Sequence, residues 1–454
     1  MNQPTLILNH SLFQNNSLPS EDKSFSLLFS YMSSFPTPGP SGPRLKVRTD
    51  FDKVALKSNF DKKIWQYTTD RDWNFYWASV QTVRQIFNPD GGYPRLNEDQ
   101  IINHFPNHVE LTRKDLMVKN IKRYRREAEK ENSHLTERDA NGSCQLDIFP
   151  TTYVLPADYS IFVEEFKRNP NSMWIMKPTS KAQGKGIFII NKLSQIKKWA
   201  SQRWQNLSVK EAFIVSRYID NPFLLGGKKF DLRLYYLVTS YRPLRVYSYA
   251  EGFARVCNVK YTNDADNIDN LFVHLTNVAI QKQGDEYNDK HGNKWSYRNL
   301  RMFIEATRGY EACQRLWDAI QFIVVHSLKS VQNVMVNDKH CFECYGFDIM
   351  IDDNLKPWLI EVNASPSLTH STPADRVMKT KLIHDILQVV IPPDWPETKT
   401  SKGAAGWNQQ LVVGGFELIY DEAYQGPASD SKTSGRERSG SGFRRGGGGQ
   451  SRWR

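Results

Sequence analysis

The sequence has no long apolar run. No stretch of its 454 residues approaches the roughly twenty apolar residues that a helix needs to cross a bilayer. The first residues lack the basic segment of a signal peptide, and the apolar stretch at 5–8 is too short to form its core. We therefore expect a soluble, cytoplasmic protein with no membrane insertion and no secretion.

Cysteine is scarce, with five residues, an odd number. This excludes a disulfide framework and fits a reducing compartment. Cys341 and Cys344 have the spacing of half a zinc site, but no second pair and no His-x₃-His motif follows them. Two thiols on a strand are the expected outcome, with metal binding as the alternative.

Several motifs of known chemistry are also missing. The chain has neither the Walker spacing G-x-x-x-x-G-K-[ST] nor the G-x-G-x-x-G of a kinase loop, which argues against both classes. No Ser or Cys has a recognisable triad context, so we expect no covalent enzyme nucleophile. No recognition motif for DNA or RNA is present, and we expect no nucleic-acid partner.

Aromatic residues and positive charge are plentiful. Aromatics make up 12% of the chain, which is typical of a packed globular protein, and the net charge of +11 attracts acidic partners. Strand-like and helical stretches alternate between 174 and 365, which predicts an α/β or α+β fold. Helices are expected near 192–202 and 298–335.

A basic helix is predicted from residue 112. Thr112 as N-cap and Asp115 three residues later form a capping-box pattern. The helix carries six basic residues near its start: Lys114, Lys119, Lys122, Arg123, Arg125 and Arg126. Such a run usually forms a solvated face, and the alternative is a surface that faces an acidic substrate.

The stretch YGFDIMIDDNLKPWLIEVNASPSL at 345–368 predicts a hairpin that turns at 352–354. Regular alternation then puts four residues on one face: Asp348, Leu359, Glu361 and Asn363. Carboxylate and amide oxygens so arranged suit Mg²⁺ bound together with substrate phosphates. An amphipathic hairpin with a wet face is the alternative.

Two further segments carry basic residues at positions that suggest a binding site for an anion. Lys177 ends a buried-looking strand, and the following loop contains Gly184, whose backbone can close on a polyanion. The segment GGKKFDLRLYYLV places Lys229, Asp231 and Arg233 at alternate positions, and hence on one face of a strand. That row suits a site in which cations neutralise phosphates.

Taken in order, these motifs resemble the tubulin tyrosine ligase-like family of ATP-grasp amino acid ligases, over about residues 45–395. The matching motifs are Lys177-Pro, QGKGIF, KKFDLR, GFAR, HLTN, GFD and IEVNASPSL, and DWNFYW, NHFPNH and DKHCFECYG are similar to its polyglutamylase branch. The resemblance implies an α+β fold with an ATP-grasp-type core. The implied division is a disordered leader at 1–44, an N-terminal domain at 45–111, a central domain at 112–219, a C-terminal domain at 220–395 and a mostly flexible basic tail at 396–454.

The resemblance also implies roles for residues. ATP-binding residues would be Lys177, Gln183, Gly184, Ser216, Arg217, Tyr218, Ile219, Lys229, Phe230, Asp231, Thr276 and Asn277, with the segment 216–219 as the adenine hinge. Mg²⁺, as two ions, would be held by Asp348, Glu361 and Asn363. Catalysis would rest on Lys177, Arg233 and Glu361, and the incoming amino acid on Gln183, Arg255 and Lys294. Tyrosine ligase itself has Gln where Ser216 stands.

The implied activity is ATP-dependent ligation of free L-glutamate to glutamate side chains in the acidic C-terminal tail of tubulin, through an acyl phosphate. Other subunits of a polyglutamylase complex are implied as partners, and the cytoskeleton, cilium axoneme and basal body as locations. Two alternatives remain: a glycylase with the same chemistry, and an inactive microtubule-binding scaffold. Intact Lys177, Asp231, Arg233, Glu361 and Asn363 argue against the scaffold.

Overall fold

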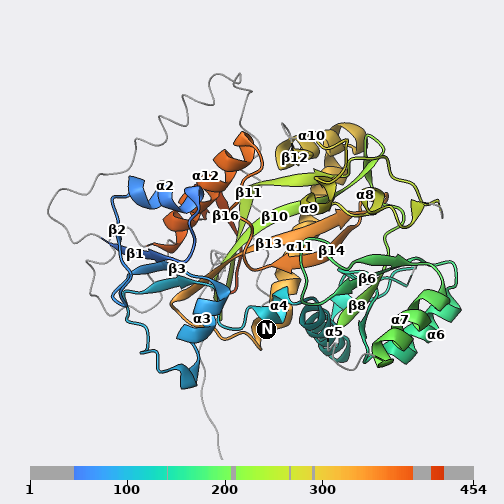
Figure 1. Cartoon of the computed structure of the whole chain (residues 1–454), viewed down its shortest axis with the longest axis horizontal. Helices are drawn as coiled ribbons and strands as arrows, with labels where there is room; N and C mark the ends of the chain where they lie inside the picture. Colours follow the sequence, from blue (N-terminus) through green and yellow to red (C-terminus); the bar gives the residue numbers. More distant parts are fainter. Residues whose placement is uncertain are drawn as a thin grey trace, which may run out of the picture.

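The computed structural model describes residues 45–140, 142–205, 211–264, 267–288, 292–391 and 411–423 (Figure 1). The predicted leader and the Arg-rich end of the tail lie outside the described residues. No helix within these ranges has the length and apolar character needed to span a membrane.

Two sheets and their covering helices make up the described chain. The strands are β1 (Lys46–Thr49), β2 (Gln66–Tyr67), β3 (Phe75–Trp77), β4 (Ile101–Asn103), β5 (Thr152–Leu155), β6 (Trp174–Pro178), β7 (Phe188–Ile190), β8 (Phe213–Arg217), β9 (Leu224–Leu225), β10 (Lys228–Tyr241), β11 (Leu244–Val256), β12 (Lys294–Ser296), β13 (Cys341–Ile351), β14 (Pro357–Asn363), β15 (Val412–Val413) and β16 (Phe416–Asp421). The α-helices are α2 (Val54–Lys62), α3 (Val80–Ile86), α4 (Val109–Thr112), α5 (Lys114–Lys130), α6 (Tyr159–Arg168), α7 (Leu193–Gln205), α8 (Leu271–His274), α9 (Val278–Gln281), α10 (Tyr297–Arg308), α11 (Tyr310–Gln332) and α12 (Pro373–Val390). This mixed architecture confirms the predicted fold class.

Within the described residues, twelve strands form the larger sheet. Its main order is β15-β16-β11-β10-β13-β4-β3-β1-β2, with β12, β14 and β9 paired beside it. The long strands β10, β11 and β13 pair antiparallel, whereas β13 runs parallel to β4. The N-terminal strands therefore continue the sheet of the C-terminal part, and the division of the chain at 111 and 219 stays a prediction.

Helices cover both faces of this sheet (Figure 1). One apolar cluster joins one face to α5, α10 and α11, and includes Ile121, Leu300 and Val324. A second cluster joins the other face to α2 and α12, through residues such as Phe60 and Ile383. Strand β13 is buried along its whole length because it lies between the two layers.

The smaller sheet has the order β5-β8-β6-β7, and all its pairings are antiparallel. Helices α6 and α7 lie against it at the lower right of Figure 1, and Phe162, Trp174 and Ile196 pack together in their shared cluster. Its other side faces the larger sheet. Residues Ile175, Ile189 and Tyr218 there contact Leu275, which follows α8.

Several sequence predictions are confirmed. The hairpin is β13 and β14, the strand, loop and strand after Trp174 are β6 and β7, and the helix near 192–202 is α7. All five cysteines are free and buried, as expected for strand and core thiols. The predicted helical stretch 298–335 is instead two helices, because Gly309 between them has φ +89°.

Three predictions need correction. Thr112 ends α4, and Arg113 is the N-cap of α5 and pairs with Asp115, so the predicted capping box is wrong. An irregularity in the β13–β14 register after Asp348 places Leu359 in the core, although it also borders the pocket described below. The tail at 396–454 contains β15 and β16, which extend the large sheet because β16 pairs with β11 and β15 with β16.

Candidate active site

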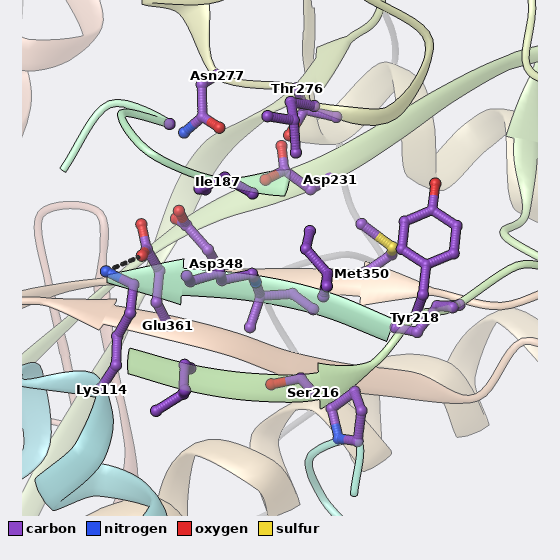
Figure 2. Close-up of a pocket in the computed structure, with 18 of the residues that line it drawn as sticks. Lys114, Ile187, Ser216, Tyr218, Asp231, Thr276, Asn277, Asp348, Met350 and Glu361 are labelled. Atoms are coloured by element: carbon purple, nitrogen blue, oxygen red, sulfur yellow. Dashed lines mark ion pairs between the residues drawn. The ribbon is translucent and has the colours of Figure 1, made fainter. Parts of the chain in front are cut away.

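A pocket lies between the two sheets and is bordered by the start of α5 and by the loop after β6 (Figure 2). The carboxylate ends of Asp348 and Glu361 point to the same end of it, near Asn277, while Ser216 and Met350 lie toward the other end. The pocket thus has one charged end and one largely apolar end.

Most of the predicted site residues line this pocket: Lys177, Gln183, Gly184, Ser216, Arg217, Tyr218, Ile219, Lys229, Asp231, Arg255, Thr276, Asn277, Asp348 and Glu361. Four others do not border it. Phe230 is buried in the core, and Arg233 contacts the pocket residue Asp348. Lys294 pairs with Asp375 at 3.0 Å, and Asn363 lies beyond Glu361 on β14.

The loop after β6 closes over the charged end through two left-handed residues. Gln183 has φ +64° and Gly184 has φ +79°. A Cβ on Gly184 would clash with Ile280 Cδ1 and lie 3.2 Å from Asn277 Oδ1. Glycine is therefore required here both by the backbone conformation and by the close approach of α9.

We expect Gly184→Ala to raise the KM for nucleotide about tenfold, because left-handed strain and the clash with Ile280 must move the loop. Gly92→Ala is the matched control, since Gly92 has φ +63° and open space around its Cα. The control should lower the free energy of unfolding by about 1 kcal/mol and leave the KM unchanged. If Gly184→Ala and Gly92→Ala raised the KM equally, backbone strain alone would account for the effect.

Two lysines bring positive charge into the pocket wall. Burial lowers the pKa of both Lys177 and Lys229, that of Lys229 to about 7. Lys229 Nζ donates to the Tyr218 hydroxyl at 2.8 Å and lies 4.1 Å from the centre of that ring. In the part of the chain that the structure describes, the Lys177 ammonium has neither a hydrogen bond nor an ion pair. Both groups are thus available to a bound anion.

A short polar chain holds Lys229 in place. His274 Nε2 lies 3.0 Å from the carbonyl oxygen of Asn267, so this nitrogen carries the proton. The Tyr218 hydroxyl then donates to His274 Nδ1 at 2.7 Å and accepts from Lys229. This role of His274 could not be predicted from the sequence because Tyr218, Lys229 and His274 lie far apart in it.

Nucleotide affinity should fall as pH rises above about 7. The pKa of Lys229 is about 7, so its ammonium is present below that pH and lost above it, and a phosphate then loses a cation. We expect a KM for nucleotide that rises by about tenfold per pH unit from pH 7 to 8.5. Lys229→Arg should flatten the profile, because arginine stays charged. A wild-type profile without this slope would contradict a role of the Lys229 ammonium at the phosphates.

Four charged side chains form a buried cluster beside the lysines. Arg255 donates from Nε to Asp231 Oδ1 at 2.7 Å and from a terminal nitrogen to Asp348 Oδ2 at 2.7 Å. Arg233 donates to both oxygens of Asp348, at 2.6 and 3.1 Å. Although burial alone would raise it, the two guanidinium groups hold the pKa of Asp348 well below its usual range. Asp348 is therefore a carboxylate at neutral pH.

Glu361 has a partner that the sequence analysis did not foresee. Lys114, the first residue of α5, lies with Nζ 2.9 Å from Glu361 Oε2, as Figure 2 shows. The same Nζ lies 3.4 Å from the carbonyl oxygen of Lys181 in the loop after β6. The basic helix thus contributes its first lysine to the site, and a cation bound at Glu361 would replace this ion pair.

The residues Asp348, Glu361 and Asn363 fit a hard cation. Asp348 and Glu361 are cross-strand partners, and the Asn363 amide nitrogen donates to Gly346 O at 3.3 Å, which leaves its oxygen as the ligating atom. Two carboxylates and an amide oxygen suit Mg²⁺ held jointly with phosphates. The described residues contain no cluster of three or more His, Cys, Asp or Glu side chains that would hold a metal alone.

The apolar end suits a flat ring. Met350 lies there, Ile175 and Ile187 are further apolar residues of the pocket lining, and the Thr152 and Ser216 hydroxyls, which are 2.8 Å apart, add a polar edge. Ser216 and Thr152 are paired across β8 and β5. Ser216 was predicted as a site residue but these apolar side chains were not, because isolated apolar residues on strands carry no distinguishing pattern.

The sequence of this chain is similar to proteins of known families. The model of the tubulin-tyrosine ligase family matches residues 94–399, and the chain belongs to that family. It is 56% identical over 390 residues to the probable alpha-tubulin polyglutamylase Ttll1 of Tetrahymena thermophila, which covers 84% of this chain and 94% of that protein.

Two further relatives have similar names. The probable tubulin polyglutamylase TTLL9 of Bos taurus is 41% identical over 388 residues, 79% of either chain. The tubulin polyglutamylase TTLL5 of Homo sapiens is 37% identical over 310 residues, 65% of this chain and 22% of that protein. The expected resemblance to this family and to polyglutamylases is confirmed.

Proposed function

We propose that this chain is an ATP-dependent tubulin polyglutamylase. The observation that carries the proposal is one pocket end where Lys177, which forms no ion pair in the described part of the chain, lies near Asp348 and Glu361, while the buried Lys229 lies further along the wall at Tyr218. Such an end suits triphosphate and Mg²⁺, and the apolar end suits adenine. Relatives with polyglutamylase names support the choice of reaction.

In this proposal ATP supplies a phosphoryl group that converts the acceptor side-chain carboxylate into an acyl phosphate. Mg²⁺ would be held by Asp348, Glu361 and Asn363, as two ions. Lys177, Lys229 and Arg233 would offset negative charge as the phosphoryl group transfers. The backbone of 216–219 would contact adenine, and Thr276 and Asn277 would complete the pocket wall.

The incoming amino acid is proposed to be L-glutamate. Arg255 and Lys294 are cross-strand partners on β11 and β12, so Arg255 in the pocket wall has a second cation next to it, beyond the wall. Glutamate offers two carboxylates and glycine one, and the second cation therefore favours glutamate. Displacement of phosphate by the glutamate amine would give the isopeptide bond.

The acceptor is proposed to be the acidic C-terminal tail of tubulin, with the chain at the cytoskeleton, in cilium axonemes and basal bodies, and within a polyglutamylase complex. The basic face of α5 contributes less free charge than its sequence indicates. Arg125 pairs with Glu129 and Asp147, and Arg123 donates to Ser330 O. The charge that steers the tail would then come from the whole chain.

The proposal is tested with the chain reconstituted with its companion subunits, tubulin and ATP, and with labelled glutamate or labelled glycine in parallel. Glutamate should enter tubulin only when ATP and Mg²⁺ are present, and glycine should not. Incorporation of glycine instead would support the glycylase. ATP binding without transfer of either amino acid would support the inactive scaffold.

A further inference from the structure

A second charged cluster lies beyond the pocket, at the start of α12. Asp375 is buried, and one of its oxygens, Oδ2, receives all of its partners. Lys294 Nζ lies 3.0 Å from it, Lys379 Nζ 3.1 Å and the Ser371 backbone nitrogen 3.0 Å. The other oxygen, Oδ1, is buried and has no hydrogen-bond partner in the described part of the chain.

This arrangement is unusual for a buried carboxylate. A buried oxygen without a donor costs free energy, and native structures generally satisfy such atoms. Burial alone would raise the pKa of Asp375, but Lys294 and Lys379 more than offset this and lower it. The group is thus an anion at neutral pH, and its buried Oδ1 accepts no hydrogen bond within the described residues.

The position of Asp375 connects it to the amino acid site. Lys294 is the cross-strand partner of Arg255, and its Nζ lies 4.5 Å from the centre of the Phe253 ring. Asp375 therefore contacts Lys294, which is one of the two cations proposed to hold the carboxylates of the amino acid. A free amino acid also carries an ammonium group, which needs an anionic partner when it leaves water.

The other carboxylates of the site are already engaged. Both oxygens of Asp231 accept from Arg255, and both oxygens of Asp348 accept from Arg233. Glu361 pairs with Lys114 and is proposed to ligate the cation. Among these described acids, Asp375 is the one with an unpartnered buried oxygen beside Lys294.

We propose that Asp375 Oδ1 receives the ammonium group of the incoming amino acid while Lys294 and Arg255 hold its carboxylates. This inference rests on the proposed function. A structural role is the competing explanation, because Asp375 follows the N-cap Thr372, whose hydroxyl accepts from its backbone nitrogen at 3.2 Å, and because Asp375 anchors Lys294.

Glutarate separates the two explanations, because it keeps both carboxylates of glutamate and lacks the ammonium. In the reconstituted wild-type complex, with labelled glutamate, tubulin and ATP, the inhibition constant of glutarate should exceed the glutamate KM by at least about tenfold, the cost of a lost charged hydrogen bond. A ratio near one would overturn the proposal, and this arm needs no variant to fold.

Asp375→Asn should raise the glutamate KM by roughly 10- to 100-fold and leave the glutarate inhibition constant within about twofold of wild type. Lys294→Met should weaken both ligands. Asp385→Asn is the matched control, since Asp385 is also a buried acid of α12 and accepts hydrogen bonds from Tyr249 and Gly415, none of which borders the pocket. It should change neither constant.

Equal weakening of glutamate and glutarate by Asp375→Asn would overturn the proposal and leave Asp375 as an anchor of Lys294. Unchanged glutamate KM in a folded variant would also overturn it. Failure of the proposed function gives a different result: the wild-type complex then transfers no glutamate at all, and both proposals fall together.

Discussion

Glu361→Gln should reduce ligation by about a thousandfold or more while the fold is retained. The amide keeps the shape of β14 but removes one of two negative charges proposed to hold Mg²⁺ beside the phosphates. Activity at saturating Mg²⁺ measures the loss, and circular dichroism checks the fold. Glu305→Gln on the exposed side of α10 is the matched control and should behave as wild type.

The ion pair of Glu361 with Lys114 offers another explanation for such a loss, so Lys114 must be changed as well. Lys114→Met removes that ion pair and leaves the carboxylate. If Glu361 acts on the cation, Lys114→Met should bind Mn²⁺ at least as tightly as wild type, because the metal no longer competes with the lysine. An Mn²⁺ affinity of Glu361→Gln equal to that of wild type, together with identical kinetics of the two variants, would contradict the role of Glu361 as a metal ligand.

Arg255→Met should both destabilise the protein and abolish glutamate binding. Arg255 pairs with the buried Asp231 and Asp348, and because Arg233 still pairs with Asp348, removal of Arg255 leaves the buried charge of Asp231 without compensation. We expect a loss of about 3–5 kcal/mol in the free energy of unfolding, measured in urea. Ligation should fall with it, since the cation proposed to hold a carboxylate of glutamate is gone.

A second substitution separates stability from function at Arg255. Asp231→Asn together with Arg255→Met removes one unpaired charge, so this double variant should recover part of the lost stability. Glutamate binding should not recover. If stability and glutamate KM recovered together, Arg255 would be a structural partner of Asp231 and no ligand of the amino acid.

Local periodicity was sufficient to predict the elements that hold the site. Lys229, Asp231 and Arg233 alternate along β10, and β13 and β14 form the expected hairpin. Alternation fails where the register shifts, because one extra residue on β14 between the partners of Asp348 and Ile349 is invisible in the sequence. Leu359 is placed wrongly for that reason.

Partners between distant segments are the part that sequence patterns could not supply. Lys114 belongs to a helix whose basic face looks uniform in sequence, and only the packing of α5 brings its first residue to Glu361. Strands β15 and β16 were missed because 396–454 was interpreted as one Gly/Ser/Arg-rich tail, although the stretch LVVGGFELIY at 411–420 within it is largely apolar. Strand β16 pairs with β11 and β15 pairs with β16, and these pairings together with the Gly415 contact to Asp385 hold them in place.

The transfer of oxygen between acceptor and phosphate tests the central claim most directly. The reconstituted complex is given ATP, glutamate and a synthetic tubulin-tail peptide whose glutamate side chains carry ¹⁸O. Ligation through an acyl phosphate predicts one ¹⁸O atom in each phosphate released, together with a peptide gain of glutamate residues on side-chain carboxyls. Glutamate added to the peptide without ¹⁸O in the phosphate would contradict the account, and so would phosphate release that leaves the peptide unmodified.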